Sequence, residues 1–92
     1  FSVVFGVIPD YADHPKGLHI TGVREGAPAA KAGLKEDDVI TKFGSTPVKN
    51  IYDLTYCLGQ YKPGDVVSVT VLRGPREDQE VVIKVTLEAR KQ

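Results

Sequence analysis

The chain contains one cysteine, Cys57, and neither methionine nor tryptophan. A single cysteine excludes a disulfide within the chain and a metal site built from cysteines. The twelve basic and twelve acidic residues cancel, so net charge gives no reason to expect a nucleic acid or an anionic membrane as partner. No apolar run has the length of a membrane span, and no signal peptide is recognisable. Because the 92 residues open directly in a strand-like segment, we expect one domain of a longer protein.

Motifs of enzymatic chemistry are missing. The sequence has no glycine-rich phosphate loop, no G-x-S-x-G elbow and no H-E-x-x-H pair. Asp10, Asp13 and His14 could bind a metal weakly, but a solvated acidic loop explains them better. Cys57 falls inside a helical apolar pattern and is expected to be a small core residue rather than a reactive thiol. We therefore expect no catalytic residue, no metal ligand and no cofactor in this chain.

The pattern of apolar residues predicts an α+β fold. A helix of one turn is expected to begin at Pro28 and to end at Gly33, and Asn50 is expected to cap a longer helix that reaches about Gln60. Alternation predicts strands over residues 1–8, 18–23, 39–43, 66–72 and 81–87, with a short strand or bridge at Val48. This order indicates a half-open barrel or sandwich of five to six short strands, with one short and one long helix. The charged residues from Glu88 onward are expected to fray, and residues 89–92 are expected to form a C-terminal tail after a domain of residues 1–88.

The stretch Val4-Phe5-Gly6-Val7 places a glycine between large apolar residues. Glycine weakens a strand, so its presence favours a turn with positive φ or a close approach to the backbone. In such a turn, successive N–H groups form a nest that attracts anions, and the terminal carboxylate of a peptide is one such anion. A strand with a bulge is the simpler interpretation of this stretch alone. Together with one long amphipathic helix, however, the glycine turn suits peptide capture by strand addition.

Two longer segments resemble a known family. Residues 22–40, G-V-R-E-G-A-P-A-A-K-A-G-L-K-E-D-D-V-I, look like the signature V-x-x-G-S-P-A-x-x-A-G-L-x-x-G-D-x-I of circularly permuted bacterial PDZ domains, found in HtrA-type serine proteases, site-two proteases and other processing peptidases. Residues 62–73 are similar to the family's K-P-G-D-x-V-x-L-x-V-x-R strand. Ala27 replaces a preferred Ser and Asp37 a preferred Gly, both expected away from the groove. Residues 5–11, F-G-V-I-P-D-Y, look like the PDZ domain appended to zinc-dependent aminopeptidases or carboxypeptidases.

The resemblance implies which residues meet a ligand. The amides of Phe5, Gly6 and Val7 would hold a terminal carboxylate, and Pro9 would curtail pairing further along the strand. An apolar residue at Ile51 implies an apolar preference two residues before the ligand's C-terminus. The remaining groove residues would be Val4, Ile8, Thr55 and Leu58, whereas Leu54, Cys57 and Tyr61 would face the core.

The function that follows is a non-catalytic module of a larger bacterial peptidase, either a zinc metallopeptidase or a serine protease. It would capture C-terminal or extended hydrophobic peptide segments. The alternative is a regulatory or structural domain whose groove is closed or occupied by its own parent chain, which would then gate the protease or its assembly. The expected partners are peptide or protein C-termini and the parent's catalytic domain, with no nucleic acid and no membrane insertion. The family analogy implies a place in the cell envelope, the periplasm or outside the cell.

Overall fold

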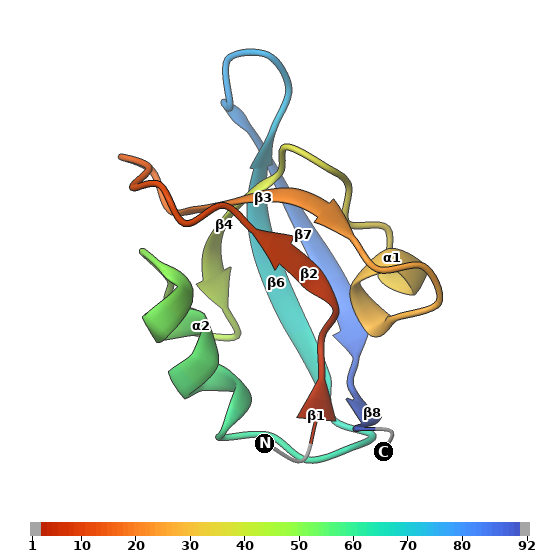
Figure 1. Cartoon of the computed structure of the whole chain (residues 1–92). Coiled ribbons are helices and arrows are strands. Elements are labelled where there is room, and N and C mark those ends of the chain that lie inside the picture. The colour runs from red at the N-terminus through yellow and green to blue at the C-terminus, as the bar shows by residue number, and fades with distance from the viewer. Residues whose placement is uncertain (1–2, 91–92) are drawn as a thin grey trace.

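The computed structural model describes residues 3–90, which form an α+β fold of eight strands and two helices (Figure 1). The elements in chain order are β1 (Val3–Val4), β2 (Val7–Pro9), β3 (Leu18–Val23), α1 (Pro28–Ala32), β4 (Val39–Phe43), β5 (Thr46–Pro47), α2 (Ile51–Leu58), β6 (Val66–Arg73), β7 (Gln79–Thr86) and β8 (Glu88–Ala89). Neither helix of this part of the chain is long and apolar enough to cross a membrane.

The strands form two sheets. The larger has the order β2-β3-β4-β6-β7, with β5 paired to β4 alone, and all its pairs are antiparallel. The second sheet joins β1 to β8, with Val3 opposite Ala89 and Val4 opposite Glu88. The order of the larger sheet makes β2 an edge strand. Its register with β3 shifts between Ile8 and Pro9, as expected where proline removes a donor from the ladder.

Alternating residues of the strands fill the core. In β6, Val67, Val69 and Val71 are buried whereas Val66 is exposed, the pattern of a strand with one face in the core. Phe43 lies at the centre, where its ring meets those of Phe5 and Tyr61 edge-on, with centroids 5.2 and 5.4 Å apart. This arrangement is the one that aromatic rings favour. Phe5 therefore anchors the segment between β1 and β2 in the core.

Local signals explain both helices. Gly33 adopts φ +105° and ends α1, as predicted from the sequence. Leu34 N–H donates to Ala29 O at 3.0 Å. The side chain of Asn50 accepts the N–H of Asp53 at 3.0 Å and caps α2. Helix α2 ends at Leu58, two residues before the predicted limit at Gln60.

The structure corrects several details of the predicted elements. The first predicted strand is two strands, since Gly6 has φ +88° and breaks the ladder, and Phe1 lies outside the described residues. The prediction that the chain frays from residue 88 is wrong for Glu88 and Ala89, because these two residues form β8. The short strand expected at Val48 is β5, just before it. The strand count of eight exceeds the predicted five to six because β1, β5 and β8 have two residues each.

Burial distinguishes several side chains of these elements. Asp38, directly before β4, has a buried carboxylate. Tyr52 and Tyr56 of α2 are exposed, whereas Tyr61 packs against the core. Cys57 is buried as predicted, and burial raises the pKa of its thiol, which disfavours the reactive thiolate.

Candidate functional site

The loop between β1 and β2 turns its carbonyls into the domain. Ala29 N–H donates to Phe5 O at 2.9 Å and Arg24 N–H donates to Gly6 O at 2.8 Å. The side chain of Phe5 is only 2% exposed. Both contacts hold the backbone of the loop from the side of α1 and β3. The opposite side of the loop is left for other partners.

The amides of this loop face the other way. Among residues 3–90, Gly6 N–H has no hydrogen-bond acceptor. Because Arg24 N–H bonds to Gly6 O, the next pair of the ladder, Val7 with Val23, is of the type that exchanges no hydrogen bonds. The N–H and C=O of Val7 therefore point toward the open edge of β2. An extended peptide laid along this edge would find both groups free.

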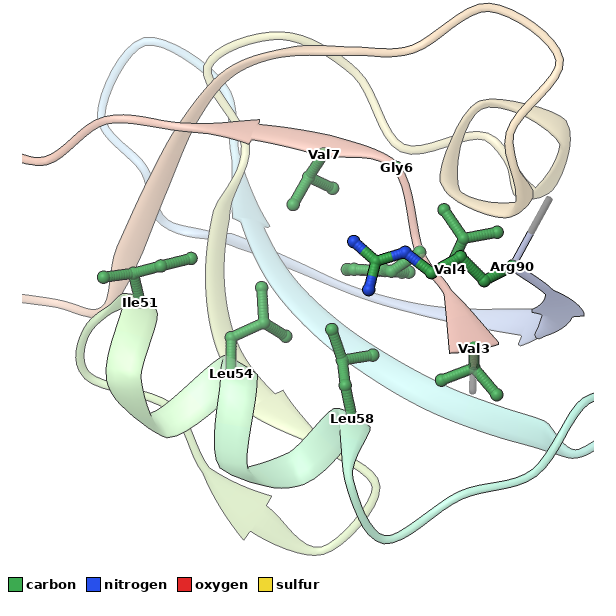
Figure 2. A pocket seen from close by; sticks show the side chains of 9 residues that line it. Val3, Val4, Gly6, Val7, Ile51, Leu54, Leu58 and Arg90 are labelled. Carbon is green, nitrogen blue, oxygen red and sulfur yellow. The ribbon is translucent and has the colours of Figure 1, made fainter. Parts of the chain in front are cut away.

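An apolar cavity of about 180 Å³ lies between the loop and α2 (Figure 2). Its walls are the loop on one side and apolar side chains of α2 on the other. The lining residues are Val3, Val4, Phe5, Gly6, Val7, Ile51, Leu54, Leu58 and Arg90. The cavity suits the apolar side chain of a terminal residue whose carboxylate reaches the loop amides.

Arg90 is the charged member of this lining, and sequence reasoning missed it. It follows β8, and Figure 2 shows its guanidinium turned into the cavity. Among residues 3–90, Arg90 forms no ion pair. Nothing in the local sequence marks the residue, because the pairing of β1 with β8 carries it to the loop. A free guanidinium beside free backbone amides favours an anionic group.

The helix residues of the expected groove are placed as follows. Ile51 and Leu58 line the cavity, and so does Leu54, which was expected to face the core and is indeed buried. Thr55 is half-buried and does not border the cavity. The lining therefore follows the spacing Ile51, Leu54, Leu58, the i, i+3, i+7 positions of one helix face.

Of the strand residues of the expected groove, too, one borders the cavity and one does not. Val4 lines the cavity, whereas Ile8 lies on the edge strand with 43% of its surface exposed and does not border it. Ala27 does not border the cavity, but it touches the loop, because a Cβ added to Gly6 would overlap the Cβ of Ala27. Ala27 thus supports the loop from behind, and only a residue without a side chain fits in front of it.

Comparison with known proteins settles the family. The family model of the PDZ domain matches residues 5–87. The chain belongs to the PDZ domain family. This PDZ domain is 38% identical over 78 residues to a probable periplasmic serine endoprotease, DegP-like, from Marinomonas sp. (strain MWYL1). The match covers 85% of the chain and 16% of that protein, so the chain spans about one sixth of the relative's length.

Solved structures share the PDZ fold. An HtrA-type protease, AlgW with decapeptide, has a TM-score of 0.86 at 22% identity, over 99% of this chain and 30% of that one. An aminopeptidase N family protein from Idiomarina loihiensis has a TM-score of 0.81 at 26% identity, over 98% of this chain and 14% of that one. The homologues and structural neighbours are thus of the HtrA and DegP type, with one further likeness to a segment of an aminopeptidase.

Proposed function

We propose that this PDZ domain binds the free C-terminus of a peptide or protein and performs no catalysis itself. The ligand adds a strand beside β2, antiparallel to it, and its terminal carboxylate meets the amides of Phe5, Gly6 and Val7. Its last side chain enters the apolar cavity, and an apolar side chain two residues earlier packs near Ile51. One observation carries this proposal: the Gly6 N–H, which has no acceptor among residues 3–90, and the guanidinium of Arg90 belong to the lining of the same cavity. Affinity of this kind is about micromolar, roughly −8 kcal/mol.

The parent protein is proposed to be a serine protease of the HtrA type that works in the bacterial cell envelope. The name of the DegP-like relative supports this choice. The alternative parent, a zinc-dependent peptidase, is supported only by the likeness to a segment of an aminopeptidase N family protein. The DegP-like relative favours the serine protease. In either parent the domain would recruit substrates or partners to a catalytic domain elsewhere in the protein.

The short edge of β2 favours a second candidate function. The strand has three residues, and its register shifts at Pro9, so a ligand strand finds few backbone partners. A segment of the parent chain, held at high effective concentration, would occupy such an edge more readily than a free peptide. In this second function the domain gates the protease or its assembly.

Binding of matched peptides tests the first function. A five-residue, N-acetylated peptide that ends in valine is titrated into the chain by calorimetry, beside the same peptide with an amidated C-terminus. We expect binding in the micromolar range for the free acid and a loss of about tenfold or more for the amide, since a hydrogen-bonded charge is removed. Equal affinity of the two peptides would refute carboxylate recognition. Absence of binding across a library of such free acids would favour the occupied groove.

A further inference from the structure

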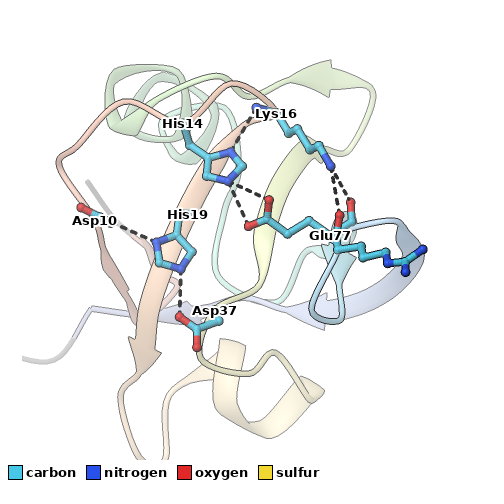
Figure 3. A network of polar contacts seen from close by, with 7 residues as sticks. Asp10, His14, Lys16, His19, Asp37 and Glu77 are labelled. Atoms are coloured by element: carbon cyan, nitrogen blue, oxygen red, sulfur yellow. Dashed lines mark hydrogen bonds and ion pairs between the residues drawn. The ribbon is translucent and has the colours of Figure 1, made fainter.

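His19 of β3 lies between two carboxylates (Figure 3). Its Nδ1 is 3.0 Å from Oδ2 of Asp10, which directly follows β2, and its Nε2 is 2.9 Å from Oδ1 of Asp37, which precedes β4. The backbone of Asp10 is tied to the same residue, because Asp10 N–H donates to His19 O at 2.9 Å. One imidazole thus links the end of the edge strand to the turn before β4.

A neutral imidazole cannot make both of these side-chain contacts. It carries one N–H, so one of its nitrogens would present a lone pair to a carboxylate. Both contacts are satisfied only when the ring is an imidazolium with a proton on each nitrogen. In agreement, the hydrogen bond to Asp10 raises the pKa of His19, with Asp37 adding to the shift and burial opposing it.

The other charged and titratable groups near His19 come from the same loop and from the β6–β7 hairpin. The ring of His14 stacks on His19 with centroids 6.0 Å apart. Nε2 of His14 faces the carboxylate of Glu77 at 3.0 Å, while its Nδ1 accepts Lys16 N–H at 3.0 Å. Nζ of Lys16 donates to the carbonyl of Glu77 at 3.3 Å. His14 thus has a carboxylate at one ring nitrogen only, whereas His19 has one at each.

The loop held by these contacts forms part of the groove. Residues 10–13 line a second cavity of about 250 Å³, together with Lys49, Asn50 and Tyr52 near the start of α2. Ile51, at the start of α2, borders both this cavity and the one beside the loop between β1 and β2. A ligand strand antiparallel to β2 would bring its upstream residues here. For such a ligand the second cavity would be the far half of the groove.

We propose that Asp10, His19 and Asp37 form a pH-sensitive brace that orders the far half of the peptide groove. The proposal rests on the peptide-binding function proposed above and adds its regulation. The side chain of Asp37 is 79% exposed and that of Asp10 is 36% exposed. When the His19 ring is neutral, it therefore keeps its hydrogen bond to Asp10, and the carboxylate of Asp37 turns into water. The loop then loses its tie to the turn before β4. Longer ligands are the ones that sense this loss, because short ones end before the second cavity.

The brace is tested first without any ligand. The ring nitrogens of His19 and the backbone amides of residues 10–13 are followed by NMR from pH 5 to 9 in the wild type and in Asp37→Asn. We expect the loop amides to shift together with the His19 ring in the wild type. In Asp37→Asn the amide side chain can accept from the charged ring or donate to the neutral one, so the loop amides should no longer follow the titration. Loop amides that ignore His19 in the wild type would overturn the brace.

Affinity for two peptide lengths then tests its effect on binding. N-acetylated free acids of three and seven residues, with no titratable side chain, are titrated at pH 5.5 and 8.5. We expect the longer peptide to bind about fivefold more tightly at pH 5.5 and the shorter one equally at both. The difference should vanish in Asp37→Asn and persist in His14→Gln, which removes the neighbouring ring. An equal pH dependence in Asp37→Asn and wild type overturns the proposal. If neither peptide binds, the peptide-binding function fails, while the ligand-free titration still decides whether the brace exists.

Discussion

Arg73 holds both carboxylate oxygens of Asp38, although the two residues lie 35 positions apart in the chain. Nε donates to Oδ1 at 2.9 Å and Nη2 donates to Oδ2 at 2.8 Å. The same guanidinium reaches Gly33 O at 3.0 Å, and the same carboxylate accepts Lys35 N–H at 3.0 Å. Asp38 is 1% exposed and is the buried charged residue among residues 3–90. This pair therefore joins the end of α1, the start of β4 and the end of β6.

Removal of one partner of this pair should destabilise the domain unequally. Arg73→Met leaves a buried carboxylate without its counter-ion, and we expect a loss of about 4 kcal/mol in the free energy of unfolding. Asp38→Leu leaves the guanidinium, whose side chain is 26% exposed, so we expect a smaller loss of about 2 kcal/mol. Urea unfolding of both variants and of the double variant measures these values. The double variant should lose less free energy of unfolding than the two single variants together. Losses that add strictly would contradict a coupling between the two side chains.

Gly6→Ala should impair both stability and peptide binding. The residue has φ +88°, a conformation that costs an L-residue roughly 1–2 kcal/mol, and the added Cβ overlaps that of Ala27. We expect the loop to shift and its amides to lose their common direction. Chemical denaturation and peptide calorimetry measure the two effects. Adding Ala27→Gly removes the overlap and leaves the φ cost, so the double variant should recover part of the loss. Wild-type behaviour of Gly6→Ala would show that the turn is dispensable.

Arg90→Gln should weaken binding of free-acid peptides by about tenfold, since a charge-assisted hydrogen bond is worth roughly 1.5–3 kcal/mol. Stability should stay near the wild-type value, because Arg90 is exposed and has no ion-pair partner among residues 3–90. Arg90→Lys should retain part of the affinity.

Lys31→Gln is the matched control for loss of one positive charge. Lys31 is exposed and pairs with Glu88 at 2.8 Å, and it lines a different surface hollow from Arg90. An equal loss of affinity in Lys31→Gln and Arg90→Gln would assign the effect to net charge rather than to the position of Arg90.

Stability should depend on pH at both ends of a plateau. The pKa of Asp10 is lowered by the N–H of Ala12 and by His19. Its contribution is therefore complete above the ordinary value of 3.8 and is lost as the pH falls through the lowered pKa. The pKa of His19 is raised, so its contribution is complete below the ordinary value of 6.5 and is lost as the pH rises through the raised pKa.

Denaturant unfolding from pH 2 to 9 measures this profile. Asp10→Asn should flatten the acid side most, since its amide does not titrate, and His19→Gln should flatten the side above pH 6.5. The fall above that pH should also be smaller in Asp37→Asn. A wild-type stability that rises from pH 6 to 8.5 would contradict the sign of the His19 contribution.

The features that could be predicted from the sequence are those that residues close together in the chain determine. Gly33 and Asn50 end and begin their helices because each acts on groups within one helical turn. At Gly6 the sequence left two interpretations open, a bulged strand and a turn with positive φ, and the structure shows the turn, with φ +88°. The α+β class followed from the alternation of apolar and polar residues in the strands and from the cap residues of the two helices. The family motif at residues 22–40 supplied the rest of the fold, and the family match confirms it.

What escaped prediction depends on distant segments. Asp38 and Arg73 lie 35 residues apart, and His19 and Asp37 lie 18 apart, so no local pattern links them. Arg90 reaches the loop only through the pairing of β1 with β8. On α2, Leu54 borders the cavity and the expected Thr55 does not, because only the packing of the helix decides which of two adjacent positions faces the loop.

The amide of Gly6 reports on whether this loop captures a terminal carboxylate. Its ¹H and ¹⁵N shifts are recorded during titration with a five-residue free acid ending in valine and with the amidated peptide. We expect a large downfield proton shift of Gly6 N–H with the acid, accompanied by a shift of Val7 N–H, and neither shift with the amide. A free acid that binds in the micromolar range while leaving the Gly6 amide unshifted would contradict it.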